Sequence, residues 1–201
     1  TIQDILMKNA EVGEQTKNGA GTSGYFGALR GRNSPISVGG FTSGAVHFME
    51  LFETTINIIS QSNIRRGNFA AYLDVEHPDI LEFLEAREEG HPLQKISMGV
   101  CITDKWINSM LDGDKDKRKI WIRILKKRFE TGYPYIFFTD NVNKKRPDVY
   151  KKEKLYITAS NLCSEVCLHS GKDESFVCDL MSLPILNYDE WKDTDLVETA
   201  T

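Results

Sequence analysis

The sequence Phe69-Ala-Ala-Tyr-Leu-Asp-Val75 is almost wholly apolar, and Ile96-Ser-Met-Gly-Val-Cys-Ile102 repeats that character about twenty residues later. Both read as buried β-strands. Between them, Pro78 stands where a first helical turn tolerates proline, and Gly90 can end the helix. Strand, helix and strand in this order predict a βαβ unit, in which the two strands are parallel.

The same alternation extends in both directions from this unit. Apolar residues at helical spacing predict helices over residues 2–17 and 43–60, and Thr103 or Asp104 can cap a third helix. Residues 112–119 read as a charged loop before a helix over 120–131, and further strands are predicted at 134–139, 155–163 and 175–181. The predicted fold class is α/β, with a mainly parallel sheet.

Composition places the chain among ordinary globular proteins. Its 201 residues include 25 Lys and Arg against 29 Asp and Glu, and the net charge of −4 argues against a nucleic-acid or membrane-surface partner. No apolar stretch is long enough to span a bilayer, and the N-terminus does not resemble a signal peptide. We therefore expect a reducing cytoplasm, in which cysteines are core residues, metal ligands or catalysts. The chain opens on Thr1 without Met, so we expect a fragment or one piece of a split protein.

The most informative segment is Thr158-Ala-Ser-Asn-Leu-Cys-Ser-Glu-Val166. On an extended strand, Asn161, Cys163 and Glu165 would project from one face. An amide, a thiol and a carboxylate on one face supply a reactive sulfur, a proton acceptor and a group that orients both. The structural alternative is a strand end that carries a buried cysteine and a solvated glutamate.

A second sulfur, from Cys178, lies in an apolar run that a returning strand could bring near Cys163. The same region offers a rival interpretation, since Cys163, Cys167, His169 and Cys178 are four candidate zinc ligands. Their spacing is unusual for structural zinc. Cys101 is most simply a core residue.

With these residues in view, the sequence resembles the large, catalytic subunit of ribonucleotide reductase. Asn161-Leu-Cys-Ser-Glu165 matches the Asn-Leu-Cys-x-Glu signature of that family. Further matching segments occur in family order over essentially the whole chain: residues 18–21, 30–36, 61–67, 132–141 and 176–180. The amino-acid sequence of these segments is most similar to class I enzymes and to versions encoded by large tailed bacteriophages.

The resemblance implies a ten-stranded α/β barrel threaded by a finger loop that carries the radical cysteine, of which residues 1–201 would form the central part. It implies that Cys163 becomes a thiyl radical and abstracts the ribose 3′ hydrogen. Glu165 would accept the 3′-hydroxyl proton, and Asn161 would hydrogen-bond the ribose and orient the carboxylate. Cys178 matches one member of the reducing dithiol pair, whose other member would lie upstream of Thr1.

The resemblance also assigns binding residues. The substrate would contact Gly21, Asn161, Ser164, Glu165, Gln61 and Arg65, the last two from the loop that meets the base. Arg30 matches an arginine that binds the effector phosphate. Ser37 stands where some relatives carry a second basic residue, and Arg32 is the candidate to replace it. Taken without the resemblance, Arg65 and Arg66 would read as a solvated pair.

No cofactor and no metal are expected on this chain itself. The implied partners are a small subunit whose di-metal or tyrosyl centre supplies the radical, a second large subunit, and thioredoxin or glutaredoxin as the dithiol reductant. The implied effectors are ATP and deoxynucleoside triphosphates. The expected location is the cytoplasm, of a bacterial host if the gene is phage-encoded, and the fragment alone should be inactive. Two alternatives remain: an adenosylcobalamin-dependent ribonucleotide reductase, and a zinc-stabilised interaction module.

Overall fold

The computed structural model describes residues 1–59, 67–178 and 182–200, and its centre is a four-stranded parallel sheet. The strands are β1 (Thr22–Tyr25), β2 (Phe69–Asp74), β3 (Ser97–Ile102) and β4 (Tyr135–Phe138), adjacent in that order. All three pairings are parallel, and Tyr72 of β2 lies opposite Gly99 of β3. Both central strands are buried on both faces, as parallel strands between two layers must be.

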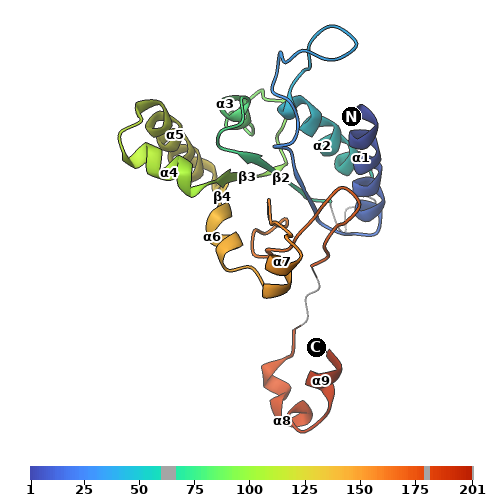
Figure 1. Ribbon diagram of the computed structural model, residues 1–201. Coiled ribbons are helices and arrows are strands. Elements are labelled where there is room, and N and C mark those ends of the chain that lie inside the picture. The colour runs from blue at the N-terminus through green and yellow to red at the C-terminus, as the bar shows by residue number, and fades with distance from the viewer. Residues whose placement is uncertain (60–66, 179–181, 201) are drawn as a thin grey trace.

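Helices cover one face of this sheet (Figure 1). They are α1 (Ile2–Lys17), α2 (Ala45–Ile59), α3 (Ile80–Phe83), α4 (Asp104–Leu111) and α5 (Lys115–Thr131). Their apolar faces bury the larger core against alternate strand residues such as Phe69, Leu73 and Val100. Because side chains alternate along a strand, the remaining strand residues point to the opposite face.

The opposite face is covered by a chain segment without regular structure. Residues 155–178 follow α6 (Thr139–Lys144) and α7 (Asp148–Lys152) and cross beneath the sheet (Figure 1). A second apolar cluster joins the two layers and contains Ala70, Tyr72, Cys101, Phe137, Ile157 and Ala159. The candidate catalytic residues therefore lie on a loop pressed against the sheet.

The C-terminal residues form small helices set apart from the sheet (Figure 1). They are the 3-10 helix η1 (Ile185–Asn187), α8 (Tyr188–Trp191) and α9 (Leu196–Ala200). Within the parts of the chain that the structure describes, no helix combines the length and the apolar character needed to cross a membrane.

The α/β alternation and the parallel sheet are confirmed, whereas several local predictions are wrong. Residues 155–163 and 175–178 form no strand, while 179–181 lie outside the described residues. Helix α5 begins at Lys115 inside the predicted charged loop, because the Asp114 carboxylate caps it by accepting the Asp116 and Lys117 N–H groups. The helix predicted between Pro78 and Gly90 is regular only over α3. Strand β1 begins at Thr22, shortly after α1 ends at Lys17, whereas the sequence predicted only a break in the helix there.

Candidate active site

A tight turn built by Asn161 forms the tip of the segment beneath the sheet. The Asn161 carbonyl accepts the Ser164 N–H at 3.2 Å, and its side-chain Oδ1 accepts the N–H groups of Glu165 and Val166, each at 3.2 Å. Ser164 closes the turn with a left-handed backbone, at φ 71°. Asn161 is accordingly buried, whereas Cys163 and Glu165 are exposed. The prediction that these three share one face of an extended strand is wrong, because the Asn161 amide turns inward to hold the loop together.

Side chains from two strands fix the loop to the sheet. Ser23 Oγ donates to the Ser160 carbonyl at 3.0 Å, and Cys101 Sγ donates to the Thr158 carbonyl at 3.3 Å. Within the loop, Ser160 Oγ donates to the Val166 carbonyl at 2.6 Å, which joins the two sides of the turn. The sheet thus holds the upstream side of the turn, and Ser160 joins the downstream side to it.

A thiol, a carboxylate and a second thiol come together at the tip. Cys178 Sγ lies 4.0 Å from Glu165 Oε1, although the two residues are 13 positions apart. Partial burial, the Glu165 carboxylate and Cys178 together raise the pKa of the Cys163 thiol. Cys163 is therefore kept protonated at neutral pH, beside a proton acceptor and a second sulfur that can share in redox chemistry.

Two further residues frame this group. The Cβ of any larger residue at Gly21 would lie 2.5 Å from Leu162 Cδ2, so Gly21 lets the tip of the loop approach the start of β1. Tyr135 of β4 lies close enough to Cys163 for the two to interact electrostatically, and burial is the main reason that the pKa of Tyr135 is raised. The sequence had placed Gly21 near the substrate, but it had not singled out Tyr135.

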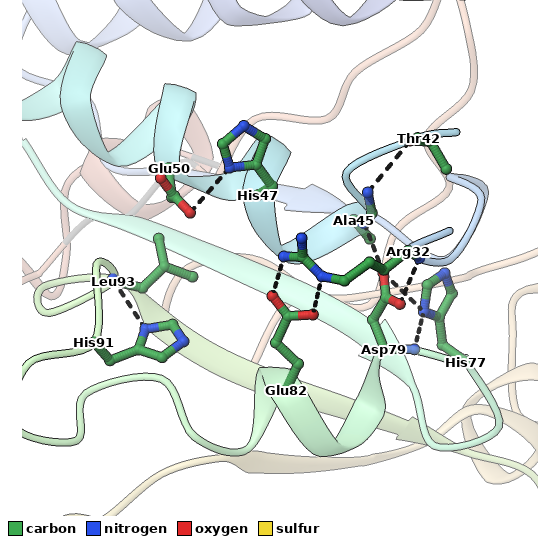
Figure 2. Close-up of polar contacts among 11 residues, drawn as sticks. Arg32, Thr42, Ala45, His47, Glu50, His77, Asp79, Glu82, His91 and Leu93 are labelled. Carbon is green, nitrogen blue, oxygen red and sulfur yellow. Dashed lines mark hydrogen bonds and ion pairs between the residues drawn. The ribbon is translucent and has the colours of Figure 1, made fainter. Parts of the chain in front are cut away.

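The predicted effector residues lie elsewhere, on the loop between β1 and α2. Arg30 donates from its guanidinium to the Pro35 carbonyl at 2.7 Å, and Ser37 is exposed. The Arg32 guanidinium is already engaged by Glu82 of α3, through Nε at 2.8 Å from Oε2 and through a second, shorter contact (Figure 2). Of the two arginines, Arg30 is therefore the one that makes no ion pair with a carboxylate among the described residues.

One buried carboxylate closes this loop at its neck. Asp79 Oδ1 accepts the backbone N–H of Arg32 and Oδ2 accepts that of Ala45, both at 2.7 Å (Figure 2). His77 completes the arrangement, since Nδ1 accepts the Asp79 N–H at 3.0 Å and Nε2 donates to the Leu29 carbonyl at 2.9 Å. We therefore interpret His77 and Asp79 as structural residues that fix where the loop begins and ends.

Two of the predicted substrate contacts, Gln61 and Arg65, lie outside the described residues.

The zinc alternative can be compared with the structure. Cys163, Cys167, His169 and Cys178 all lie within the described residues, yet over 1–59, 67–178 and 182–200 no group of three or more His, Cys, Asp or Glu residues is arranged to hold a metal. His169 instead donates from Nδ1 to the Tyr156 carbonyl at 2.6 Å. This geometry contradicts a zinc site at the four residues.

Comparison with known proteins agrees with this geometry. The sequence matches the ribonucleotide reductase barrel domain over residues 1–117 and 108–200. The structure superposes on the Actinobacillus ureae class Id ribonucleotide reductase alpha subunit with a TM-score of 0.88 and 47% identity, covering 100% of this chain and 37% of that one.

Curated relatives are more distant. A Frog virus 3 (isolate Goorha) protein, provisionally named a ribonucleoside-diphosphate reductase large subunit, is 30% identical over 98% of this chain and 37% of its own length. The vitamin B12-dependent ribonucleoside-diphosphate reductase of Thermoplasma acidophilum is 29% identical over 94% of this chain and 26% of its own. The chain thus spans well under half the length of these relatives.

A parallel sheet with helices on one face and a cysteine-bearing loop across the other places the protein in the α/β class, and the matching family model is that of a barrel domain. Within that class, the chain belongs to the ribonucleotide reductase barrel-domain family. The fold expected from the resemblance is confirmed.

Proposed function

We propose that this chain is the central part of the large subunit of a class I ribonucleoside-diphosphate reductase, which converts ribonucleotides to 2′-deoxyribonucleotides. The observation that carries the proposal is the meeting of Cys178 with Glu165, at 4.0 Å, on the same loop tip as Cys163. These two sulfurs and one carboxylate are three of the four groups that the proposed radical reduction of a ribose requires, the fourth being a second reducing thiol outside this chain.

In the proposed mechanism, Cys163 is the thiyl radical that removes the 3′ hydrogen of the ribose. Glu165 accepts the 3′-hydroxyl proton while the 2′-hydroxyl leaves as water. Cys178 and a second thiol outside this chain supply two electrons and two protons and become a disulfide. One proton leaves with the 2′-hydroxyl as water and the other hydrogen goes to C2′, after which Cys163 returns the hydrogen atom to C3′. An external dithiol, of the thioredoxin or glutaredoxin kind, then reduces the disulfide.

Asn161 has two parts in this proposal, as the resemblance implies: it orients Glu165 and it hydrogen-bonds the ribose. Its side-chain oxygen is already used by the Glu165 and Val166 N–H groups, so it sets the direction of the Glu165 backbone. Its side-chain nitrogen remains the group offered to the ribose, and the backbone around Gly21 and Ser164 would complete the substrate contacts.

Similarity favours the class I assignment over cobalamin dependence. The class Id alpha subunit is 47% identical, whereas the vitamin B12-dependent relatives are 28–29% identical. In class I enzymes the radical comes from a di-metal or tyrosyl centre in a separate small subunit, so this chain would bind no cofactor of its own. A protein of this kind would act in the cytoplasm, that of the bacterial host if a phage encodes it.

Effector and base contacts form the second part of the proposal. Arg30 and Ser37, with Arg32 beside them, would bind the phosphates of ATP or a deoxynucleoside triphosphate, and Gln61 and Arg65 would contact the substrate base. Arg32 would have to leave Glu82 to take this role, which makes Arg30 the main phosphate ligand. We expect Arg30→Ala to weaken effector binding more than Arg32→Ala, measured by equilibrium dialysis with labelled dATP.

Reconstitution tests the proposed activity. The chain would be combined with the flanking segments of a large subunit and with a small subunit, and CDP reduction assayed with a dithiol reductant and ATP. We expect turnover that is abolished by Cys163→Ser, with CDP binding retained, because serine cannot carry the radical at an accessible potential. Retained turnover in this variant would contradict the mechanism.

Cys167→Ala is the matched control, since Cys167 lies four residues from Cys163 on the same segment and has no proposed role. Its turnover should equal that of the unmodified enzyme. Turnover that requires adenosylcobalamin and no small subunit would instead select the cobalamin-dependent alternative.

A further inference from the structure

A glycine at the centre of a buried strand draws attention to its neighbour across the sheet. Gly99 lies in the middle of β3 and pairs directly with Tyr72 of β2. A Cβ at Gly99 would lie 2.3 Å from Tyr72 Cε1 and 2.4 Å from Cδ1. The Tyr72 ring therefore lies flat across the backbone of Gly99, a position that a side chain at residue 99 would deny it.

The ring is held in that position from its other side as well. Phe137 of β4 meets it edge-on, with the ring centroids 6.2 Å apart. Tyr72 is fully buried, with 0% of its surface exposed. The side chain consequently has one available direction, which leads its hydroxyl beneath the turn that carries Cys163.

The hydroxyl meets that turn at its first residue. Tyr72 Oη donates to the Asn161 carbonyl at 2.8 Å, and the same oxygen accepts the Ser164 N–H at 3.2 Å. Both acceptor positions of this carbonyl are therefore filled, one by the turn itself and one by the sheet. Burial is the main reason that the pKa of Tyr72 is raised to about 12, so the hydroxyl keeps its proton and acts as a donor at neutral pH.

We infer that Tyr72 is a positioning residue for the active-site turn: its hydroxyl, aimed by Gly99, fixes the Asn161 carbonyl and through it the placement of Cys163 and Glu165. The inference rests on the proposed function for its catalytic consequence, but its structural content can be tested without turnover. Tyr72 touches no reacting atom and acts only through the turn.

Tyr72→Phe is the decisive variant, because it removes the hydroxyl and leaves the ring over Gly99. Amide hydrogen exchange, resolved by peptide mass spectrometry, would follow the N–H groups of Glu165 and Val166, which Asn161 Oδ1 accepts. We expect their exchange to be about fivefold faster, as expected for the loss of one net hydrogen bond. Alkylation of Cys163 should also become faster, since a loosened turn separates the thiol from Glu165 and Cys178.

Tyr150→Phe is the matched control. The Tyr150 hydroxyl also holds the same segment by one hydrogen bond, which it accepts from the His169 N–H at 3.3 Å, but the bond lies beyond the turn. This variant should leave exchange at Glu165 and Val166 and alkylation of Cys163 unchanged. A thermal unfolding curve for each variant would verify that both remain folded.

In the reconstituted reductase, Tyr72→Phe should lower kcat about tenfold and leave the KM for CDP nearly unchanged, since misplaced reacting groups slow the chemical step. A folded Tyr72→Phe variant with unaltered exchange and alkylation would overturn the inference, whatever its turnover. If the unmodified enzyme reduces no CDP while the exchange effect is present, the proposed function fails and the positioning role stands.

Discussion

Cys163 illustrates how much of a residue's chemistry depends on its neighbours. It is an exposed cysteine by surface area, yet partial burial, Glu165 and Cys178 raise the pKa of its thiol. A raised thiol pKa lowers the fraction of thiolate near neutral pH and so protects the sulfur from alkylation and metal capture. For a residue proposed to react as a thiyl radical, remaining a protonated thiol until it loses a hydrogen atom is an advantage.

Glu165→Gln should therefore bring the pKa of the Cys163 thiol closer to that of a free cysteine. Removing the carboxylate removes one cause of the raised pKa, so the midpoint of the pH–alkylation curve should shift to lower pH. At pH 8 the alkylation rate should rise about two- to fivefold, as expected for the loss of one nearby charge in a solvent-screened site. Peptide mass spectrometry after timed iodoacetamide treatment measures this rate.

The control is Glu174→Gln, on the same segment but beside His169. It should leave the Cys163 curve where it is. A curve for Glu165→Gln that moves to higher pH would show that the assigned electrostatic cause is wrong.

At the scale of elements, the regular parts of the fold were predictable and the active-site segment was not. Helices α1, α2 and α4 and strands β2 and β3 follow from apolar periodicity and capping residues. Residues 155–163 were wrongly predicted to form a strand, because their alternate apolar residues pack against the sheet as those of a strand would. Their polar groups are instead satisfied by side chains such as Ser23 and Asn143, a pattern that depends on contacts distant in sequence.

The candidate site shows the same division. The residue types at the turn, Asn161, Cys163 and Glu165, could be recognised from their motif, and Cys178 from its place in the family order. The inward rotation of Asn161 could not, because it depends on the left-handed backbone of Ser164. The glycine at position 99 was a signal that sequence reasoning passed over, since a glycine inside a buried strand indicates a close approach by a neighbour.

Asp79 joins α3 to the preceding loop, and a substitution there tests that connection. In Asp79→Asn, one of the two side-chain acceptors becomes a donor, so the N–H of either Arg32 or Ala45 is left buried without its partner. We expect the free energy of unfolding to fall by about 1–3 kcal/mol. Urea denaturation followed by circular dichroism measures the change.

Asp116→Asn serves as the reference, because the solvent-exposed Asp116 carboxylate pairs with Lys119 at a helix surface and with no other cation among the described residues. It should unfold at the same urea concentration as the unmodified chain. Equal urea midpoints for Asp79→Asn and Asp116→Asn would show that the Asp79 contacts contribute nothing to stability.

At the scale of the whole molecule, large apolar side chains are exposed on several of the described elements, and those on α1 and α2 bear on the expected second large subunit. On α1 and α2, Leu6, Met7 and Ile58 are 53%, 64% and 77% exposed, although other side chains of the same two helices are buried in the core. Exposed apolar side chains on neighbouring helices can form an interaction surface. We propose that the second large subunit, which the family resemblance implies, contacts this chain through these helices.

Met7→Glu should therefore weaken the dimer of the assembled large subunit by at least tenfold, because a buried unpaired charge is costly at an interface. Sedimentation velocity over a concentration series measures the monomer–dimer equilibrium. Val149→Glu, which places the same charge at a 59% exposed apolar position on α7, should leave the equilibrium unchanged. An undiminished dimer in Met7→Glu would exclude α1 from the contact.

The neck that Asp79 forms has a consequence for how such a protein can diversify. One carboxylate holds the backbone at Arg32 and at Ala45, so the intervening loop starts and finishes at fixed points. Gly44 belongs to this neck, because a Cβ there would lie 2.6 Å from Asp79 Oδ2. Insertions, deletions or exchanges among residues 33–43 then carry a low entropic cost and do not reach the sheet. Under the proposed effector role, the loop is an interchangeable module through which a lineage could acquire new nucleotide preferences while the turn that holds Cys163 is inherited intact.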